Sequence, residues 1–132
     1  LVGRADETLR VRRTLCPDVA ILADVHVKHA TPLGGGEIGL SARDVAYRGL
    51  ADAIVVSGAE TGAAVDLEEL RAVRRAVPDR TLLAGSGVTP ENAAEVLSIA
   101  DGAIVGTSCE RGGKTGAPVD PVRVRALVRA AR

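Results

Sequence analysis

The sequence lacks methionine, tryptophan and phenylalanine, and Tyr47 is its only large aromatic residue. Proteins that bind single-stranded nucleic acid commonly stack bases on aromatic rings within a basic surface. This chain of 132 residues offers neither feature, because its 17 basic residues are matched by 17 acidic ones. The composition therefore predicts no nucleic-acid partner.

Long apolar runs and cysteine pairs are also missing. No apolar run approaches the roughly 20 residues that a membrane-spanning helix needs, so we expect no membrane span. Cys16 and Cys109 are the only cysteines, and they lie too far apart in the sequence to indicate a disulfide framework. A reducing, cytoplasmic location is the resulting expectation. Lysine is nearly absent too, since only Lys28 and Lys114 occur beside 15 arginines.

The residues that are present predict an α/β fold of alternating strands and helices. Apolar runs at 19–27, 52–56, 82–84 and 103–105 indicate four parallel strands, and apolar stripes at helical spacing separate them. Four such units are half of a (β/α)8 TIM barrel. The chain starts within an expected helix (1–15), so we expect residues 1–132 to form a single, partial domain, the C-terminal half of the barrel, with the N-terminal half missing.

Side chains that cap helices predict where the helices begin. Ser41, Asp66, Thr89 and Asp120 each precede an apolar stripe and are expected to be N-caps. The helix after Ser41 should bury Ala42, Val45, Ala46 and Leu50, and the last helix should place Val124, Leu127, Val128 and Ala131 on one face.

Two glycine-bearing loops follow the last two expected strands. Gly85, Ser86 and Gly87 follow the first of these strands, while Gly106 and Thr107 follow the second. Parallel strands place such loops at the same edge of the sheet, and in β/α barrels the loops after the last two strands often bind phosphate. The sequence thus predicts a phosphate site at these five residues. The alternative is that the glycines only permit tight turns.

Ionisable residues gather at the end of the first expected strand. We predict that Asp24, His26, Lys28 and His29 are catalytic, because a histidine beside a carboxylate can act as a general base and a lysine can hold a phosphate or attack a carbonyl. The alternative is an ion pair that only stabilises the barrel. Because His26 and His29 have opposite strand parity, a metal site is disfavoured, and we predict neither a metal nor another cofactor.

The second expected strand ends in further small polar residues. Ser57, Gly58 and Thr61 follow it and are candidates for ligand contacts, although the hydroxyl groups could equally cap a helix.

Several segments together resemble one protein family. They are DVHVKHA (24–30), IVVSGAETG (54–62), GSGVTPEN (85–92), DGAIVGTS (101–108) and PVD (118–120), and they are similar to motifs of the BtpA family. The resemblance covers nearly the whole chain but only the C-terminal half of the family's barrel. It implies the TIM barrel and, through the family's name, a link to photosystem I biogenesis. Relatives also occur in organisms without photosynthesis, and their chemistry is largely undefined.

Two functions therefore stay open at this point. The first is binding of a phosphorylated small molecule, such as a sugar phosphate or a nucleotide, at the barrel mouth, with or without enzymatic turnover. The second is a non-catalytic assembly or biogenesis factor related to photosystem I assembly. In either case half a barrel would leave two unpaired strand edges, so we expect a homo-oligomer.

Overall fold

The structure, a computed structural model, describes residues 4–27, 36–58 and 64–132. Four strands form one parallel sheet in the order β1-β2-β3-β4. They are β1 (Leu22–Asp24), β2 (Ala53–Val56), β3 (Thr81–Ala84) and β4 (Gly102–Ala103). The predicted alternation of four parallel strands with helices is confirmed.

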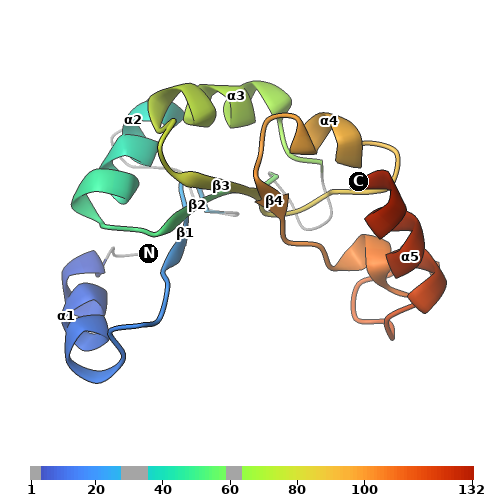
Figure 1. The fold of residues 1–132 in the computed structure, drawn as a ribbon, viewed down its shortest axis with the longest axis horizontal. Coiled ribbons are helices and arrows are strands. Elements are labelled where there is room, and N and C mark those ends of the chain that lie inside the picture. The colour runs from blue at the N-terminus through green and yellow to red at the C-terminus, as the bar shows by residue number, and fades with distance from the viewer. Residues whose placement is uncertain (1–3, 28–35, 59–63) are drawn as a thin grey trace.

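The helices are arranged on one side of the sheet and at its two ends. Helices α2 (Ile38–Arg43), α3 (Leu67–Ala76) and α4 (Ala93–Leu97) cover one side, while α1 (Ala5–Leu15) and α5 (Pro121–Ala130) lie at opposite ends of the arc (Figure 1). A π-helical turn, η1 (Asp44–Arg48), extends α2, and two short 3₁₀ turns, η2 (Thr107–Cys109) and η3 (Arg111–Gly113), follow β4.

The core lies between the sheet and its covering helices. Ile54 and Val56 of β2, with Leu82 and Ala84 of β3, point into it and are almost fully buried. Helix α3 contributes its own apolar stripe, as the sequence predicted, with Leu70, Val73 and Val77 completely buried. Because side chains alternate along a strand, the residues between these core positions lie on the other side of the sheet.

Two of the four predicted N-caps are confirmed by their hydrogen bonds. The Asp66 carboxylate accepts from the backbone N–H groups of Glu68 and Glu69, and Asp120 accepts from Val122 N–H at 2.9 Å. The Ser41 prediction was wrong, because α2 already begins at Ile38 with Glu37 at the N-cap position. Thr89 starts a turn that leads into α4, whose N-cap position is Asn92.

The segment after α2 departs from the predicted regular helix. Gly49 N–H donates to Asp44 C=O five residues back, which makes the last turn wider than an α-helical turn. Leu50 then adopts a positive φ of 51° and is half exposed. The predicted burial of Leu50 was therefore wrong, whereas Ala42 and Ala46 are fully buried as expected.

The first strand is shorter than the predicted run of residues 19–27. In the described part of the chain β1 pairs only with β2, through Leu22, Ala23 and Asp24. The chain before it is tied down at Ile21, whose carbonyl accepts from the N–H groups of Asp52 and Ala53. Past Asp24, Val25 N–H still donates to Val55 C=O at 3.1 Å, but the strand pairing itself ends at Asp24, so the apolar run overestimates the strand.

Two aspartates form matching contacts at the edge of the sheet where the strands begin. Asp52 accepts from Ile21 N–H at 2.7 Å and from Arg12 of α1 at 2.6 Å. Asp101 likewise accepts from Leu82 N–H at 2.8 Å and from Arg74 of α3 at 2.6 Å. We call these two groups the aspartate clamps. Each ties a strand to its neighbour and to the helix before that neighbour.

The clamps lower the pKa of both carboxyl groups. For Asp101 the hydrogen bond from Arg74 is the main cause, followed by the Leu82 N–H. For Asp52 the Ile21 N–H is the main cause, and Arg12 adds to it. These contacts stabilise the ionised carboxylates, so the clamps are closed at neutral pH.

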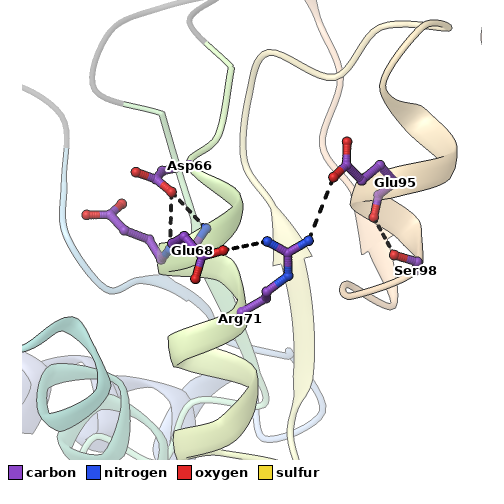
Figure 2. A network of polar contacts seen from close by, with 6 residues as sticks. Asp66, Glu68, Arg71, Glu95 and Ser98 are labelled. Carbon is purple, nitrogen blue, oxygen red and sulfur yellow. Dashed lines mark hydrogen bonds and ion pairs between the residues drawn. The ribbon is translucent and has the colours of Figure 1, made fainter.

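A looser polar network joins the outer surfaces of α3 and α4. Arg71 lies 2.7 Å from Glu68 of its own helix and 3.7 Å from Glu95 of α4, and Asp66 caps the same helix nearby (Figure 2). The side chains of Glu68 and Glu95 are 77% and 59% exposed, so water screens these pairs. They contribute little to stability compared with the clamps.

Candidate functional site: a pocket between two glycine loops

The loops after β3 and β4 lie side by side and enclose a pocket of about 400 Å³. Its lining comes from residues 85–89, residues 104–108, Gly113 and Arg123. We call it the two-loop pocket. All five residues predicted for phosphate binding line it, namely Gly85, Ser86, Gly87, Gly106 and Thr107. The two loops therefore lie next to each other, as the sequence predicted.

The first loop is held by a side chain from the turn that follows it. Gly87 has a φ of 67°, which a residue with a Cβ rarely adopts. Asn92 then bridges the loop, since its Oδ1 accepts from Thr89 N–H at 2.8 Å and its Nδ2 donates to Gly87 C=O at 2.9 Å. These contacts fix the backbone at one wall of the pocket.

The second loop is fastened to the first loop and to the segment before α5. Ser108 Oγ donates to Val88 C=O at 2.7 Å and so joins the two walls directly. The backbone of Cys109 and Arg111 exchanges hydrogen bonds with Asp120 and Pro118. Both walls are thus held by hydrogen bonds within the protein.

Backbone donors are available inside the pocket. Within the described ranges, the N–H groups of Gly87, Gly106 and Thr107 have no hydrogen-bond acceptor from the protein. Unpaired N–H groups that line a concave loop are suited to an anion, whose oxygens can accept several of them at once.

Arg123 supplies a positive charge that the sequence reasoning missed. It belongs to the first turn of α5, and its Nε donates to Ser108 C=O at 2.7 Å. A Cβ on Gly113 would lie only 3.2 Å from one of its terminal nitrogens, so glycine leaves room for the guanidinium. A sequence signal for Arg123 existed. A cation in the first turn of a helix is unfavourable beside the positive end of the helix dipole, so its presence there indicates a role outside the helix.

The charge of Arg123 also acts on Glu91, two residues after the lining residue Thr89. The pKa of Glu91 is lowered, chiefly by a side-chain hydrogen bond with Thr89 and to a smaller extent by Arg123. Glu91 is exposed and follows the lining residue Thr89 by two positions, so a negative charge stands near the pocket as well as the positive charge of Arg123.

Asp24 and Ser57 form a second polar group at the same edge of the sheet. Ser57 Oγ donates to Asp24 Oδ1 at 2.6 Å, and Asp24 is exposed. A Cβ on Gly85 would lie 2.4 Å from Ser57 Oγ and 2.7 Å from Val55 Cγ1, so only glycine allows Ser57 to lie there. The next residue, Gly58, donates its N–H to Ser86 Oγ at 3.0 Å. The ends of β1, β2 and β3 are thereby connected.

His26 has a different neighbour from Asp24. Its Nε2 lies 3.3 Å from Ser41 Oγ of α2, on the helix that covers the sheet, whereas Asp24 contacts Ser57. The strand ends at Asp24, so the alternation of side chains along a strand does not place His26 on the same face as Asp24. Lys28, His29 and Thr61 lie outside the described residues.

Within residues 4–27, 36–58 and 64–132, no group of three histidine, cysteine or carboxylate side chains could hold a metal ion. The same residues include no helix that is long and apolar enough to cross a membrane. Both cysteines are free thiols.

The family model of the BtpA family matches residues 1–132, the entire chain. The chain belongs to the BtpA family. Similar family members include the photosystem I biogenesis protein BtpA of Synechocystis, which is 43% identical over 97% of this chain and 45% of its own length. An uncharacterized protein of Pyrococcus furiosus is 42% identical over 96% of this chain and 47% of its own length.

The chain therefore spans about half the length of these curated relatives.

A solved structure shows the same fold with a more distant sequence. The N-(5'-phosphoribosyl)anthranilate isomerase of Pyrococcus furiosus is 20% identical, with a TM-score of 0.61 over 96% of this chain and 56% of that one. The four-stranded arc of this BtpA-family chain thus matches part of a TIM-barrel enzyme, which confirms the predicted fold class.

Proposed function

We propose that this BtpA-family chain binds a phosphorylated small molecule in the two-loop pocket, at the C-terminal mouth of the barrel. The observation that carries the proposal is the convergence of two glycine loops and one arginine on a single pocket. The loops come from neighbouring parallel strands, β3 and β4, and open at the edge where such sheets bind ligands.

The pocket offers the chemistry that a phosphate group requires. Backbone N–H groups of both loops can donate hydrogen bonds to the phosphate oxygens. Arg123 adds charge, and its guanidinium can form two parallel hydrogen bonds to a phosphate. If only tight turns were needed, the loops would not require an arginine held against them by Ser108.

The test is a titration of the 132-residue chain with inorganic phosphate, in which binding is monitored through the backbone amide chemical shifts. We expect shifts at residues 85–88 and 106–108. Arg123→Gln should weaken binding by about tenfold or more, because a charge-assisted hydrogen bond contributes about 1.5–3 kcal/mol.

Arg125→Gln is the matched control, since Arg125 is exposed on the same helix and does not line the pocket. Melting curves of both variants would show whether either has lost stability. Equal phosphate affinity in the two variants, or unchanged amide shifts in the wild type, would contradict the proposal.

A second candidate function is the non-catalytic one, an assembly or biogenesis factor. The name of the Synechocystis relative, at 43% identity, supports it. An uncharacterized relative is as similar, at 42%, so identity alone favours neither function. A chain that leaves phosphate unbound while keeping its fold would favour this second function.

We also propose that the chain forms a homo-oligomer. Within the described residues β1 pairs only with β2 and β4 only with β3, so each has one open edge. The end helices α1 and α5 contain no buried residue, although both carry apolar side chains. A second copy could cover these surfaces.

A further inference from the structure

Asp24 lies on the side of the sheet away from the covering helices. Its neighbour Ala23 packs against the core, so Asp24 points to the opposite side. The same alternation places Val55, next to Ile54, on that side. The surroundings of Gly85 agree with this placement, because Ser57 Oγ and Val55 Cγ1 together occupy the space that a Cβ on Gly85 would take. Asp24, Ser57 and Gly85 therefore share one face.

Ile104 continues this row toward the two-loop pocket. Its N–H donates to Ala84 C=O, and the core-facing Ala103 precedes it, so its side chain lies on the same face as Gly85. Ile104 lines the pocket and is 49% exposed. Gly85 and Ile104, which both line the pocket, thus lie on the same face of the sheet as the Asp24–Ser57 pair.

Ser57 acts as a positioning residue for Asp24. Its hydroxyl donates a hydrogen bond to Oδ1 of the carboxylate at 2.6 Å. Asp24 has no other hydrogen bond among the described residues, so Oδ2 can accept one from a ligand hydroxyl. The carboxylate is exposed, so a ligand can reach it without movement of the strand.

The distance between these two groups limits the length of a ligand that contacts both. The pocket lies by β3 and β4 and Asp24 on β1, two to three strand spacings away, which corresponds to about 10–14 Å. A hydrogen bond to Asp24 takes up about 3 Å of this distance. About 7–11 Å is then left between the phosphorus and the far oxygen of the ligand.

That length matches particular phosphate esters. An extended chain advances by about 1.2 Å per bond, so the seven bonds from phosphorus to the far hydroxyl of a five-carbon ester span about 8 Å. The five bonds of a three-carbon ester span only about 6 Å. We propose that the site takes a phosphate monoester of a five- or six-carbon polyol, with its phosphate in the two-loop pocket and its far hydroxyl on Asp24. This inference rests on the proposed phosphate site.

The test compares three probes on the 132-residue chain by calorimetry and amide shifts: inorganic phosphate, glycerol 3-phosphate and ribitol 5-phosphate, which has no carbonyl group and so cannot close into a ring. Ribitol 5-phosphate should bind about tenfold or more tightly than glycerol 3-phosphate, because only the longer ester gains the hydrogen bond to a charged acceptor. Asp24→Ala should abolish this difference and leave the affinity for inorganic phosphate unchanged.

Asp18→Ala is the control, because Asp18 is an exposed aspartate that precedes β1 and contacts neither group. It should keep the preference for the longer ester. If phosphate binds but ribitol 5-phosphate has no advantage, or if its advantage survives Asp24→Ala, the length inference is wrong and the phosphate site stands. If inorganic phosphate itself does not bind, both proposals fail.

Discussion

Gly85 shows how one missing side chain determines the arrangement of its neighbours. The space that its Cβ would take is filled by the Ser57 hydroxyl and by Val55. Ser57 can therefore reach Asp24 across the end of β2. Glycine at this position is explained by close packing, whereas at Gly87 the positive φ is the reason.

We predict that Gly85→Ala destabilises the chain by about 1–3 kcal/mol, the usual effect of forcing extra volume into a packed site. Denaturant unfolding would measure the change. In a Ser57→Gly background the closest overlap, 2.4 Å, is removed, so the same substitution should then have a smaller effect. An equal loss of stability in both backgrounds would mean that Ser57 does not fill this space.

At the scale of helices and strands, the aspartate clamps carry more of the stability than the surface ion pairs. Leu82 N–H is buried with its residue and donates to Asp101, whereas Arg71 and Glu95 meet across water-exposed surface. A buried donor that loses its acceptor is more costly than a screened ion pair that is lost.

Asp101→Ala should therefore cost about 1–3 kcal/mol at neutral pH, because Leu82 N–H loses its acceptor. Glu95→Ala, as the control, should cost about 0–1 kcal/mol. Urea unfolding of both variants tests the difference. A larger effect from Glu95 than from Asp101 would be incompatible with the roles given to the clamp and to the surface pair.

The effect should also depend on pH. The pKa of Asp101 is lower in the folded chain than its ordinary value of 3.8, so the unfolded chain binds the proton more readily. Its contribution is complete above that value and is lost as the pH falls through the lower, folded pKa. The stability difference between wild type and Asp101→Ala should accordingly narrow in acid.

Local chemistry predicted many of these elements, and tertiary contacts explain the failures. Asp66 and Asp120 cap helices through neighbours two or three residues away, which a sequence reveals. Ser41 looked like a similar cap, but α2 starts three residues earlier, and its contact with His26 depends on the fold. The length of β1 depends on where β2 begins, far along the chain.

The candidate site shows the same division. The two glycine loops were predictable, because parallel strands must end at one edge of the sheet. Arg123 carried only an indirect signal, its charge in the first turn of a helix, because it reaches the pocket only when α5 folds back against Ser108. The role of Gly85 as space for Ser57 also depends on the register of β2 and β3.

At the scale of the whole molecule, the arc leaves apolar surface at both of its ends. Leu15 and Val19 lie near one end and are 76% and 56% exposed, while Val119 and Val122 near the other are 63% and 66% exposed (Figure 1). Each end also has a strand edge whose N–H and C=O groups could pair with another strand.

We predict that the isolated 132-residue chain is a dimer or a larger assembly at micromolar concentration. Light scattering with size-exclusion chromatography would measure the mass. Leu15→Glu should shift the equilibrium toward the monomer, because a charge would replace an exposed apolar contact. A stable monomeric wild type would rule out the proposed homo-oligomer.

The aspartate clamps lie at the edge where the strands begin, and the two-loop pocket opens at the edge where they end. Mutational tolerance should be divided in the same way. Apart from Gly85 and Gly87, whose backbone positions require glycine, substitutions in the loops after β3 and β4 leave the clamps intact, so ligand preference can change there with little risk of unfolding. Directed evolution for new ligands should therefore find many folded variants at the other positions of these loops and few at Gly85, Gly87, Asp52, Asp101 or the arginine partners of the two aspartates.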